Sequence, residues 1–159
     1  MRYFLKHTLL ILLVAICSSC SADDGSSDTN PDLINETSIT EQILVLINQH
    51  RSNLGLGNLS QNSIAIDLAI QHTNYMINEQ KISHDNFDER ASILQNEENA
   101  TGWAENVASR YPTAESVVNG WLNSSGHKRN IEGNYTKTGI AAIKDSNGHY
   151  YFTQIFFRN

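Results

Sequence analysis

The stretch HYYFTQIFFRN, residues 149–159, decides the fold class of this chain. Successive side chains of a β-strand point to opposite faces, and here both faces are apolar: Tyr150, Phe152 and Phe156 on one, Tyr151, Ile155 and Phe157 on the other. A strand of this kind belongs to a sheet that is covered on both sides. The stretch therefore predicts a sheet buried between two layers.

The rest of the chain supplies the other strands and the covering layers. The run TGIAAIKD, residues 138–145, is joined to the last strand by DSNG, which is typical of a hairpin, and WAENVAS, residues 103–109, predicts a third strand. Helical patterns cover about 38–54, 63–80, 88–95 and 112–122. Helices followed by antiparallel strands predict an α+β fold, a three-layer α-β-α sandwich with a mainly antiparallel central sheet.

The first residues have a different character. Arg2 and Lys6 precede the apolar run TLLILLVAIC, which is too short to span a bilayer as a mature helix and predicts an export signal. The signal resembles that of bacterial lipoproteins, in which a cysteine after small residues is acylated. Cys20 follows Ser18 and Ser19 and is the expected lipidation site. A cleaved signal without a lipid is the alternative.

These features divide the chain into a signal peptide (1–19), a lipidated cysteine with a polar tether (20–37) and a folded domain (38–159). A capping-box spacing between Ser38 and Glu41 predicts the start of the first domain helix. Both cysteines, Cys17 and Cys20, precede the domain, so its stability has to come from its core. The formal net charge of −6 and the lack of a basic block argue against nucleic acid as a partner.

Three short segments carry candidate chemistry: ISHD around His84, GWAENVA around Glu105 and NSSGHKRNI around His127. With flanking motifs, their order resembles the CAP superfamily (cysteine-rich secretory, antigen 5 and pathogenesis-related proteins), in a cysteine-poor bacterial branch. The resemblance runs from about residue 40 to the C-terminus. The residues that carry it are Asn48 and Arg51, Ser83-His84, Ala104 to Ala108, Trp121 to Ile131, and Thr153-Gln154.

The resemblance implies a central cleft lined by two histidines, His84 and His127, and two acids, of which Glu105 is the first. The second acid is expected five residues before Trp121, where this chain has Ser116. Glu115 lies one place earlier, about 100° around the helix. Glu115 is therefore a tentative fourth member, and a triad is the alternative.

The residues themselves allow several kinds of chemistry. Imidazole and carboxylate ligate zinc, so His84 and His127, with Glu105 nearby, could hold a zinc or another divalent ion. We expect the Ser124–Gly126 turn to aim His127 at the cleft. Without metal, the same three residues could work as acid and base. A buried ion pair is the structural alternative for Glu105, and simple surface exposure is the alternative for the two histidines.

The leading hypothesis is an exported, lipid-anchored binding module at the cell envelope. Its cleft would take a small amphipathic, lipid-like ligand or a divalent ion, and folding would need no cofactor. The rival hypothesis is a peptidase-like hydrolase that uses His84, His127 and Glu105. A third is an adhesion or interaction module that contacts an envelope component. Whether the protein is an enzyme stays open at this point, because one fold hosts many functions.

Overall fold

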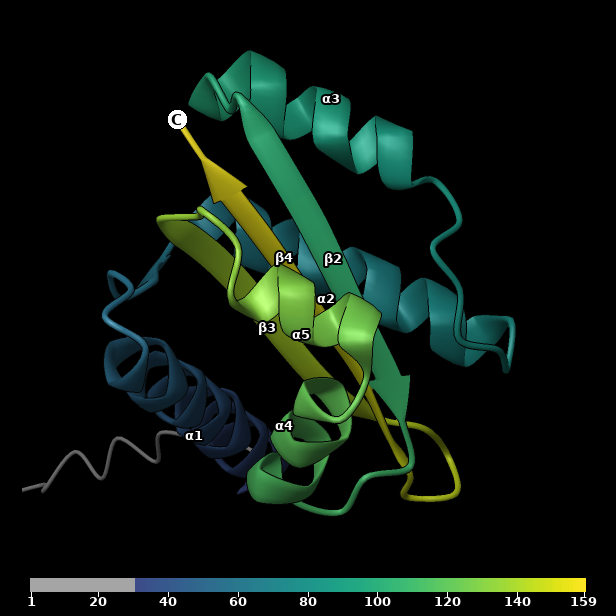
Figure 1. Ribbon diagram of the computed structural model, residues 1–159. Coiled ribbons are helices and arrows are strands. Elements are labelled where there is room, and N and C mark those ends of the chain that lie inside the picture. Colours follow the sequence, from purple (N-terminus) through teal and green to yellow (C-terminus); the bar gives the residue numbers. More distant parts are fainter. Residues whose placement is uncertain (1–30) are drawn as a thin grey trace, which may run out of the picture.

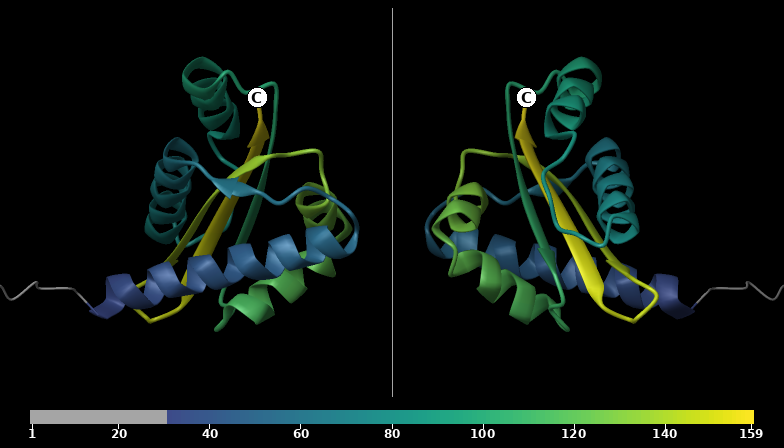
Figure 2. Two further views of the ribbon diagram at one scale, coloured as in Figure 1. Left: turned by 90° about the vertical axis from the view of Figure 1, so that its left-hand side faces the viewer. Right: turned by 90° about the vertical axis from the view of Figure 1, so that its right-hand side faces the viewer.

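The computed structural model describes residues 31–159, with side chains from Ile39 onward. Its core is a sheet between two helical layers, as the side views show (Figure 2). Helices α2 (Ser63–Asn78) and α3 (Phe87–Glu98) lie on one side. Helices α1 (Pro31–Asn53), α4 (Ala114–Leu122) and α5 (Ser125–Ile131) lie on the other. This is the predicted α+β three-layer sandwich.

The sheet has the strand order β1-β3-β4-β2 (Figure 1). Strand β4 (Tyr150–Arg158) is central and pairs antiparallel with β3 (Lys137–Lys144) and with β2 (Gly102–Ser109). The two-residue strand β1 (Ser60–Gln61) pairs parallel with β3 and was not predicted. Strand β2 is therefore an edge strand. Residues from the two faces of the sheet can approach one another around its unpaired edge.

The two faces of β4 are buried as its sequence predicts. Tyr150, Phe152 and Phe156 belong to a cluster with α1, α4 and α5. Ile155 and Phe157 pack with α2 and α3, and Tyr151 packs with Met76 of α2. All buried hydrophobic residues of these clusters lie between Ile39 and Phe157, so residues 31–159 contain the whole described core.

Two predicted boundaries are wrong. Helix α1 begins at Pro31, so Ser38 lies inside the helix and not at its N-cap, and residues 31–37 are helical where a tether was expected. The signal peptide, Cys20 and the rest of the tether lie outside the described residues. Within the described part, no helix is both long and apolar enough to cross a membrane.

The second correction concerns the segment before His127. Ser124 is the N-cap of a separate helix, α5, and Ser125 and Gly126 form its first turn. The expected turn at Ser124–Gly126 is therefore a helix start. Serine, asparagine and glycine favour turns and N-caps alike, so their composition alone does not separate the two.

Two polar side chains of α1 hold the backbone of the neighbouring loops in place through hydrogen bonds. Arg51 donates to the carbonyls of Gly57, Ile131, Gly133 and Tyr135 at 2.7–3.0 Å. Asn48 exchanges two hydrogen bonds with the backbone of Leu59. Burial lowers the pKa of Arg51, which nevertheless remains a cation. These contacts tie the C-terminal end of α1 to the loop between α5 and β3.

Candidate functional site

Glu105 is the centre of the site. Strand alternation places its side chain with Trp103 and Val107 on the α2–α3 face, and the side chain is 1% exposed. Arg90 of α3 holds the carboxylate with two hydrogen bonds, from Nε to Oε2 and from Nη2 to Oε1, both 2.8 Å. His84 Nδ1 donates to Oε1, also at 2.8 Å. The buried ion pair that was the structural alternative for Glu105 is thus present.

Glu105 stays ionised although it is buried, because of these hydrogen-bond partners. Burial raises the pKa of the carboxyl group, but the hydrogen bonds from His84 and Arg90 and the charge of Arg90 outweigh it. The resulting pKa lies below the ordinary value. An ionised carboxylate only accepts hydrogen bonds, so His84 carries its proton on Nδ1 when the ring is neutral.

His72 of α2 also lies close to the Glu105 carboxylate. Its Nε2 donates to the carbonyl of Ser83 at 2.8 Å and lies 3.7 Å from Glu105 Oε1. Burial is the largest influence on His72 and lowers its pKa, so the ring is neutral at pH 7. The bond to Ser83 fixes the loop that carries His84. His72 is the hydrogen-bonded core histidine that its place on an apolar helix stripe suggests.

His84 is the exposed member of the cluster. Its side chain is 53% exposed, and Nε2 has no partner among residues 31–159. The ring borders a hollow of about 320 Å³, called the His84 hollow below. This hollow is lined by His84, Phe87, Trp103, Ala104, Glu105, Asn130 and Tyr135. A half-exposed imidazole with one nitrogen unpaired among the described residues thus lines a hollow with three aromatic residues.

His127 lies on α5, on the other face of the edge strand β2. Asn106 donates to the His127 carbonyl at 3.2 Å, and Asn130 donates to Asn106 Oδ1 at 2.9 Å and to the Glu105 carbonyl at 3.1 Å. These bonds hold α5 against β2. Burial and then the charge of His84 lower the pKa of His127, so the two rings influence each other. The His127 side chain does not line the His84 hollow.

The second acid of the family pattern has no counterpart at this site. Ser116 uses its hydroxyl in a capping box with Thr113, donating to the Thr113 carbonyl at 2.8 Å. Glu115 is exposed in the first turn of α4. Neither residue lines the His84 hollow, and neither does His127, so of the expected site residues only His84 and Glu105 meet there.

The donor set does not fit a zinc ion with three protein ligands. Across residues 31–159, no group of three or more His, Cys, Asp or Glu side chains gathers closely enough to hold a metal. Glu105, the expected third ligand, already accepts hydrogen bonds on both oxygens. A metal at His84 would have to displace these donors or be held by two imidazoles and water.

Sequence reasoning missed Arg90 and the role of His72. Arg90 follows Asp88 and Glu89 in a polar helical stretch, where a cation normally faces solvent. No local pattern distinguishes it from a surface residue. His72 lies on an apolar stripe of α2, and only the fold reveals that it is close to Glu105.

Comparisons with known proteins agree with the fold described above. Residues 44–156 match the cysteine-rich secretory protein family, CAP. Among solved structures, an outer surface protein from Borrelia burgdorferi is 22% identical, with a TM-score of 0.69, over 77% of this chain and 93% of the other. An extracellular protein with an SCP domain from Bacillus anthracis is 29% identical, with a TM-score of 0.69, over 84% and 45%.

A cysteine-rich secretory protein from Staphylococcus aureus is 18% identical, with a TM-score of 0.67, over 78% of this chain and 39% of the other. This chain thus spans less than half of the Bacillus and Staphylococcus proteins. No curated protein matches the sequence. The family match covers well over half of the chain and includes His84, Glu105 and His127. The chain therefore belongs to the CAP (cysteine-rich secretory protein) family.

Proposed function

We propose that this protein is an exported, envelope-anchored binding module whose His84 hollow takes a small, neutral amphipathic ligand. The observation that supports the proposal is the hydrogen bonding and position of His84. Its Nδ1 is hydrogen-bonded to a buried carboxylate that already accepts from Arg90, and the ring, with Nε2 unpaired among the described residues, lines an aromatic-walled hollow. A fixed acceptor beside apolar walls suits a ligand with one hydroxyl and an apolar body.

The walls and the volume support this choice of ligand. Phe87, Trp103 and Tyr135 are half-buried, so each shows part of its ring to the hollow. A volume of about 320 Å³ is at the lower end of the range of ligand pockets. Tyr135 donates to the Trp103 carbonyl at 3.3 Å, which fixes its ring. Apolar contact would supply the affinity, and His84 would orient the ligand.

A hydrolase is the second candidate, because the His84–Glu105 pair at 2.8 Å has the geometry of a general base with its orienting acid. Two observations favour binding over hydrolysis. Both Glu105 oxygens are occupied, and the hollow is lined by no serine, threonine or cysteine that could serve as a nucleophile within residues 31–159. A divalent ion is also less favoured than an amphiphile, since the third ligand is committed to Arg90.

The N-terminal sequence and the similar proteins support the proposed location. The signal and Cys20 predict export and a lipid anchor. The Borrelia protein is an outer surface protein, and the Bacillus protein is extracellular. An anchored domain at the envelope would meet amphiphiles released from or passing between membranes.

Trp103 provides a probe for the test. It is half-buried in the hollow, whereas the other domain tryptophan, Trp121, is buried on the opposite face. Titration with monodecanoylglycerol should change the Trp103 fluorescence in a saturable way. His84→Ala should weaken binding by about tenfold, which corresponds to one hydrogen bond. His149→Ala, which removes an exposed histidine elsewhere, is the matched control.

Equal affinity in the wild type and His84→Ala would contradict the binding proposal. Turnover of an ester substrate that Glu105→Gln abolishes would establish the hydrolase instead. Calorimetric titration with zinc alone is a separate arm. Tight zinc binding that both His84→Ala and His127→Ala remove would assign the site to a metal.

A further inference from the structure

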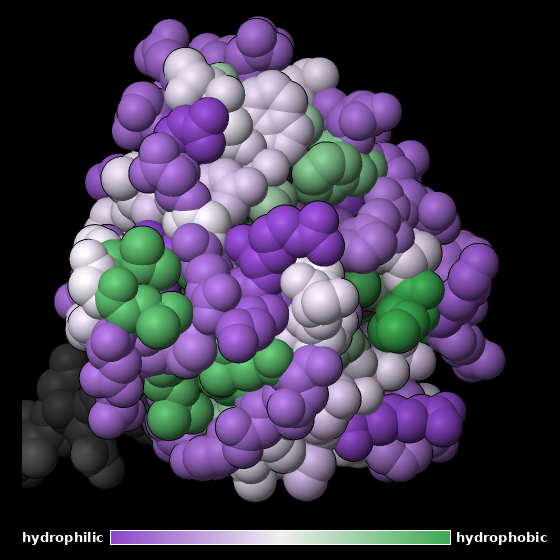
Figure 3. All heavy atoms as spheres, in the orientation of Figure 1, coloured by the Kyte–Doolittle hydropathy of each residue, from purple (hydrophilic) through white to green (hydrophobic). Residues whose placement is uncertain are grey.

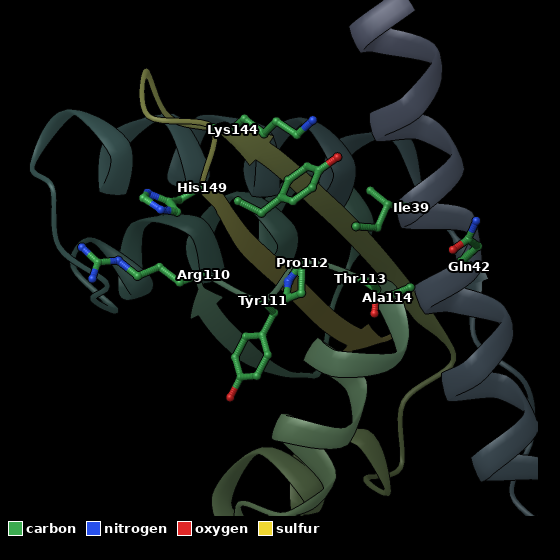
Figure 4. A pocket seen from close by; sticks show the side chains of 11 residues that line it. Ile39, Gln42, Arg110, Tyr111, Pro112, Thr113, Ala114, Lys144 and His149 are labelled. Carbon is green, nitrogen blue, oxygen red and sulfur yellow. The ribbon is translucent and has the colours of Figure 1, made fainter.

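A second hollow lies at the other end of β2, away from His84 (Figure 4). It has a volume of about 390 Å³ and is formed by three segments. These are the N-terminal half of α1, the connection from β2 to α4, and the β3–β4 hairpin. Its lining, called the Arg110 pocket below, comprises Ile39, Gln42, Arg110 to Ala114, Lys144, and Gly148 to Tyr150.

The charge of this pocket is opposite to that of the chain. Arg110, Lys144 and His149 line it, and none of its lining residues is an aspartate or a glutamate, although the formal net charge of the chain is −6. In Figure 4 the Arg110 and His149 side chains extend to one side, and the Lys144 side chain extends to the opposite side. Among the side chains of residues 39–159, neither Arg110 nor Lys144 has a carboxylate within 4.0 Å. Two permanent cations therefore lie at this pocket without a counter-charge from that part of the chain.

The nearest hairpin carboxylate, Asp145, is committed to the turn. Its Oδ1 accepts from the backbone N–H groups of Asn147 at 2.9 Å and His149 at 2.8 Å. Its Oδ2 lies 3.7 Å from His149 Nδ1. These backbone bonds, above all the one from His149, lower the pKa of Asp145, so it stays ionised as part of the hairpin. Asp145 does not belong to the lining of the pocket.

The backbone and the neighbouring rings hold the cations in place. Arg110 has φ +66°, a left-handed conformation that L residues with a side chain rarely adopt, and its N–H donates to the Tyr150 carbonyl at 2.7 Å. Non-glycine residues in this conformation cluster at functional sites. Lys144 Nζ lies over the Tyr150 ring, 4.9 Å from its centroid.

Apart from the cations, Gln42 and Thr113, the lining is mainly apolar. Ile39, Ala114 and Tyr150 are buried in the large core cluster, and Tyr111 packs against it. Tyr111 can lie on α4 because Gly120 has no side chain there; a Cβ at Gly120 would meet the Tyr111 hydroxyl and ring. The result is a hollow that combines apolar side chains with hydrogen-bond donors.

We propose that the Arg110 pocket binds a phosphate group carried on a small organic moiety, as in a soluble phosphate ester or a phospholipid headgroup. Guanidinium and ammonium groups donate hydrogen bonds and accept none, so they select an anion. A phosphate presents several oxygens and can accept from Arg110 and His149, whose side chains extend to the same side (Figure 4), while Lys144 adds positive charge on the other side of the pocket. The apolar side chains would contact the carbon atoms of the ester.

Binding of a phospholipid headgroup rests on the proposed lipid anchor, which would hold the domain at a membrane. Binding of a soluble phosphate ester does not need the anchor. Ten residues separate Cys20 from Pro31, the first residue of α1, and a chain of that length reaches at most about 35 Å. The Arg110 pocket includes Ile39, in the N-terminal half of α1. A domain anchored through Cys20 would therefore have this pocket within reach of the membrane surface.

The test uses residues 21–159, the chain that follows the predicted signal and Cys20, so that no part of the expected tether is removed. Titration with glycerol 3-phosphate at low ionic strength, followed by amide chemical shifts, should move the signals of Arg110, Lys144 and His149 and leave His84 unchanged. Arg110→Gly and Lys144→Gln should each weaken binding at least fivefold. Arg110→Gly suits the left-handed backbone, so loss of folding would not confuse the result. Arg129→Gln removes an exposed cation from α5 and is the matched control.

Vesicle flotation separates the two sources. Binding to phosphatidylglycerol vesicles but not to phosphatidylcholine vesicles, lost in Arg110→Gly, supports a lipid headgroup. Binding of glycerol 3-phosphate without vesicle binding supports a soluble ester. Absence of both, or an equal loss in Arg129→Gln, overturns the proposal. Because the His84 hollow is tested with a neutral amphiphile, failure of one site leaves the other intact.

Discussion

Glu105 connects the chemistry of this domain to its stability. A buried carboxylate without a partner is strongly unfavourable, and here Arg90 and His84 provide the compensating contacts. The same contacts leave one nitrogen of His84 as the exposed acceptor of the hollow. Arg90 therefore positions His84 through Glu105 without lining the hollow itself.

Arg90→Met should destabilise the domain by about 3 kcal/mol at neutral pH, because it leaves the Glu105 charge buried with His84 alone. The wild-type pKa of Glu105 is lowered, so its contribution to stability is present above the unfolded value near 4.5 and is lost as pH falls through the folded pKa. In the variant, burial raises that pKa, so the penalty should shrink as acid protonates the carboxyl group.

Urea unfolding of both proteins at neutral pH and at pH 4 would measure this. The double variant Arg90→Met with Glu105→Gln is the control, because it removes the charge and should recover part of the loss. A penalty that does not depend on pH would show that Arg90 acts through packing and not through its charge.

At the scale of elements, the approach of α2 to β3 depends on a single glycine. Gly139 in β3 faces the backbone of Ala65 in α2, and a Cβ at this position would collide with the Ala65 carbonyl group. A backbone atom cannot move aside as a flexible side chain can. This contact sets the distance between the helical layer and the sheet.

Gly139→Ala should therefore destabilise the domain by about 3 kcal/mol or more, as overpacking of a rigid contact does. Gly126→Ala is the matched control, because a Cβ at Gly126 in α5 meets nothing within 4 Å. Alanine is the better helix former, so this change should stabilise by up to about 1 kcal/mol. Thermal unfolding of both variants would decide, and equal stability of the two would contradict the close contact.

For the molecule as a whole, the exposed large apolar side chains of the described residues are scattered. On the face shown in Figure 3, apolar residues form small separate patches among hydrophilic ones. The large apolar side chains that are exposed belong to different elements: Val45, Leu54, Ile70 and Ile82. The two hollows lie at opposite ends of β2, which allows one ligand at each end.

The proposed anchor leads to a prediction for the full chain. Cys20→Ser should release the protein from membranes or leave it unprocessed, because the acylated residue is lost. Cys17→Ser should be nearly silent, because bulky Ile16 precedes Cys17 where a small residue is required. Membrane fractionation with detection of the mature size would measure both. A processed Cys20→Ser protein that still fractionates with membranes would contradict the lipid anchor.

The sequence by itself determined the layers, most of the elements and the family. Local periodicity reports which side of a strand or helix is buried, and the two apolar faces of residues 149–159 required a covered sheet. The order of the motifs pointed to His84 and Glu105, which the structure joins at 2.8 Å. Burial of Glu105 followed from its alternation with Trp103 and Val107.

Only the tertiary structure decided which side chains contact Glu105, and only it showed that Glu115 does not line the His84 hollow. Arg90 and His72 reach the carboxylate from separate helices, and no local pattern encodes a contact between elements whose packing is set elsewhere. The start of α5 was missed because cap residues and turn residues are the same types, and the start of α1 was missed because residues 20–37 are mostly polar. The Arg110 pocket, too, exists only because three distant segments pack together, each of which looks like an ordinary surface in the sequence.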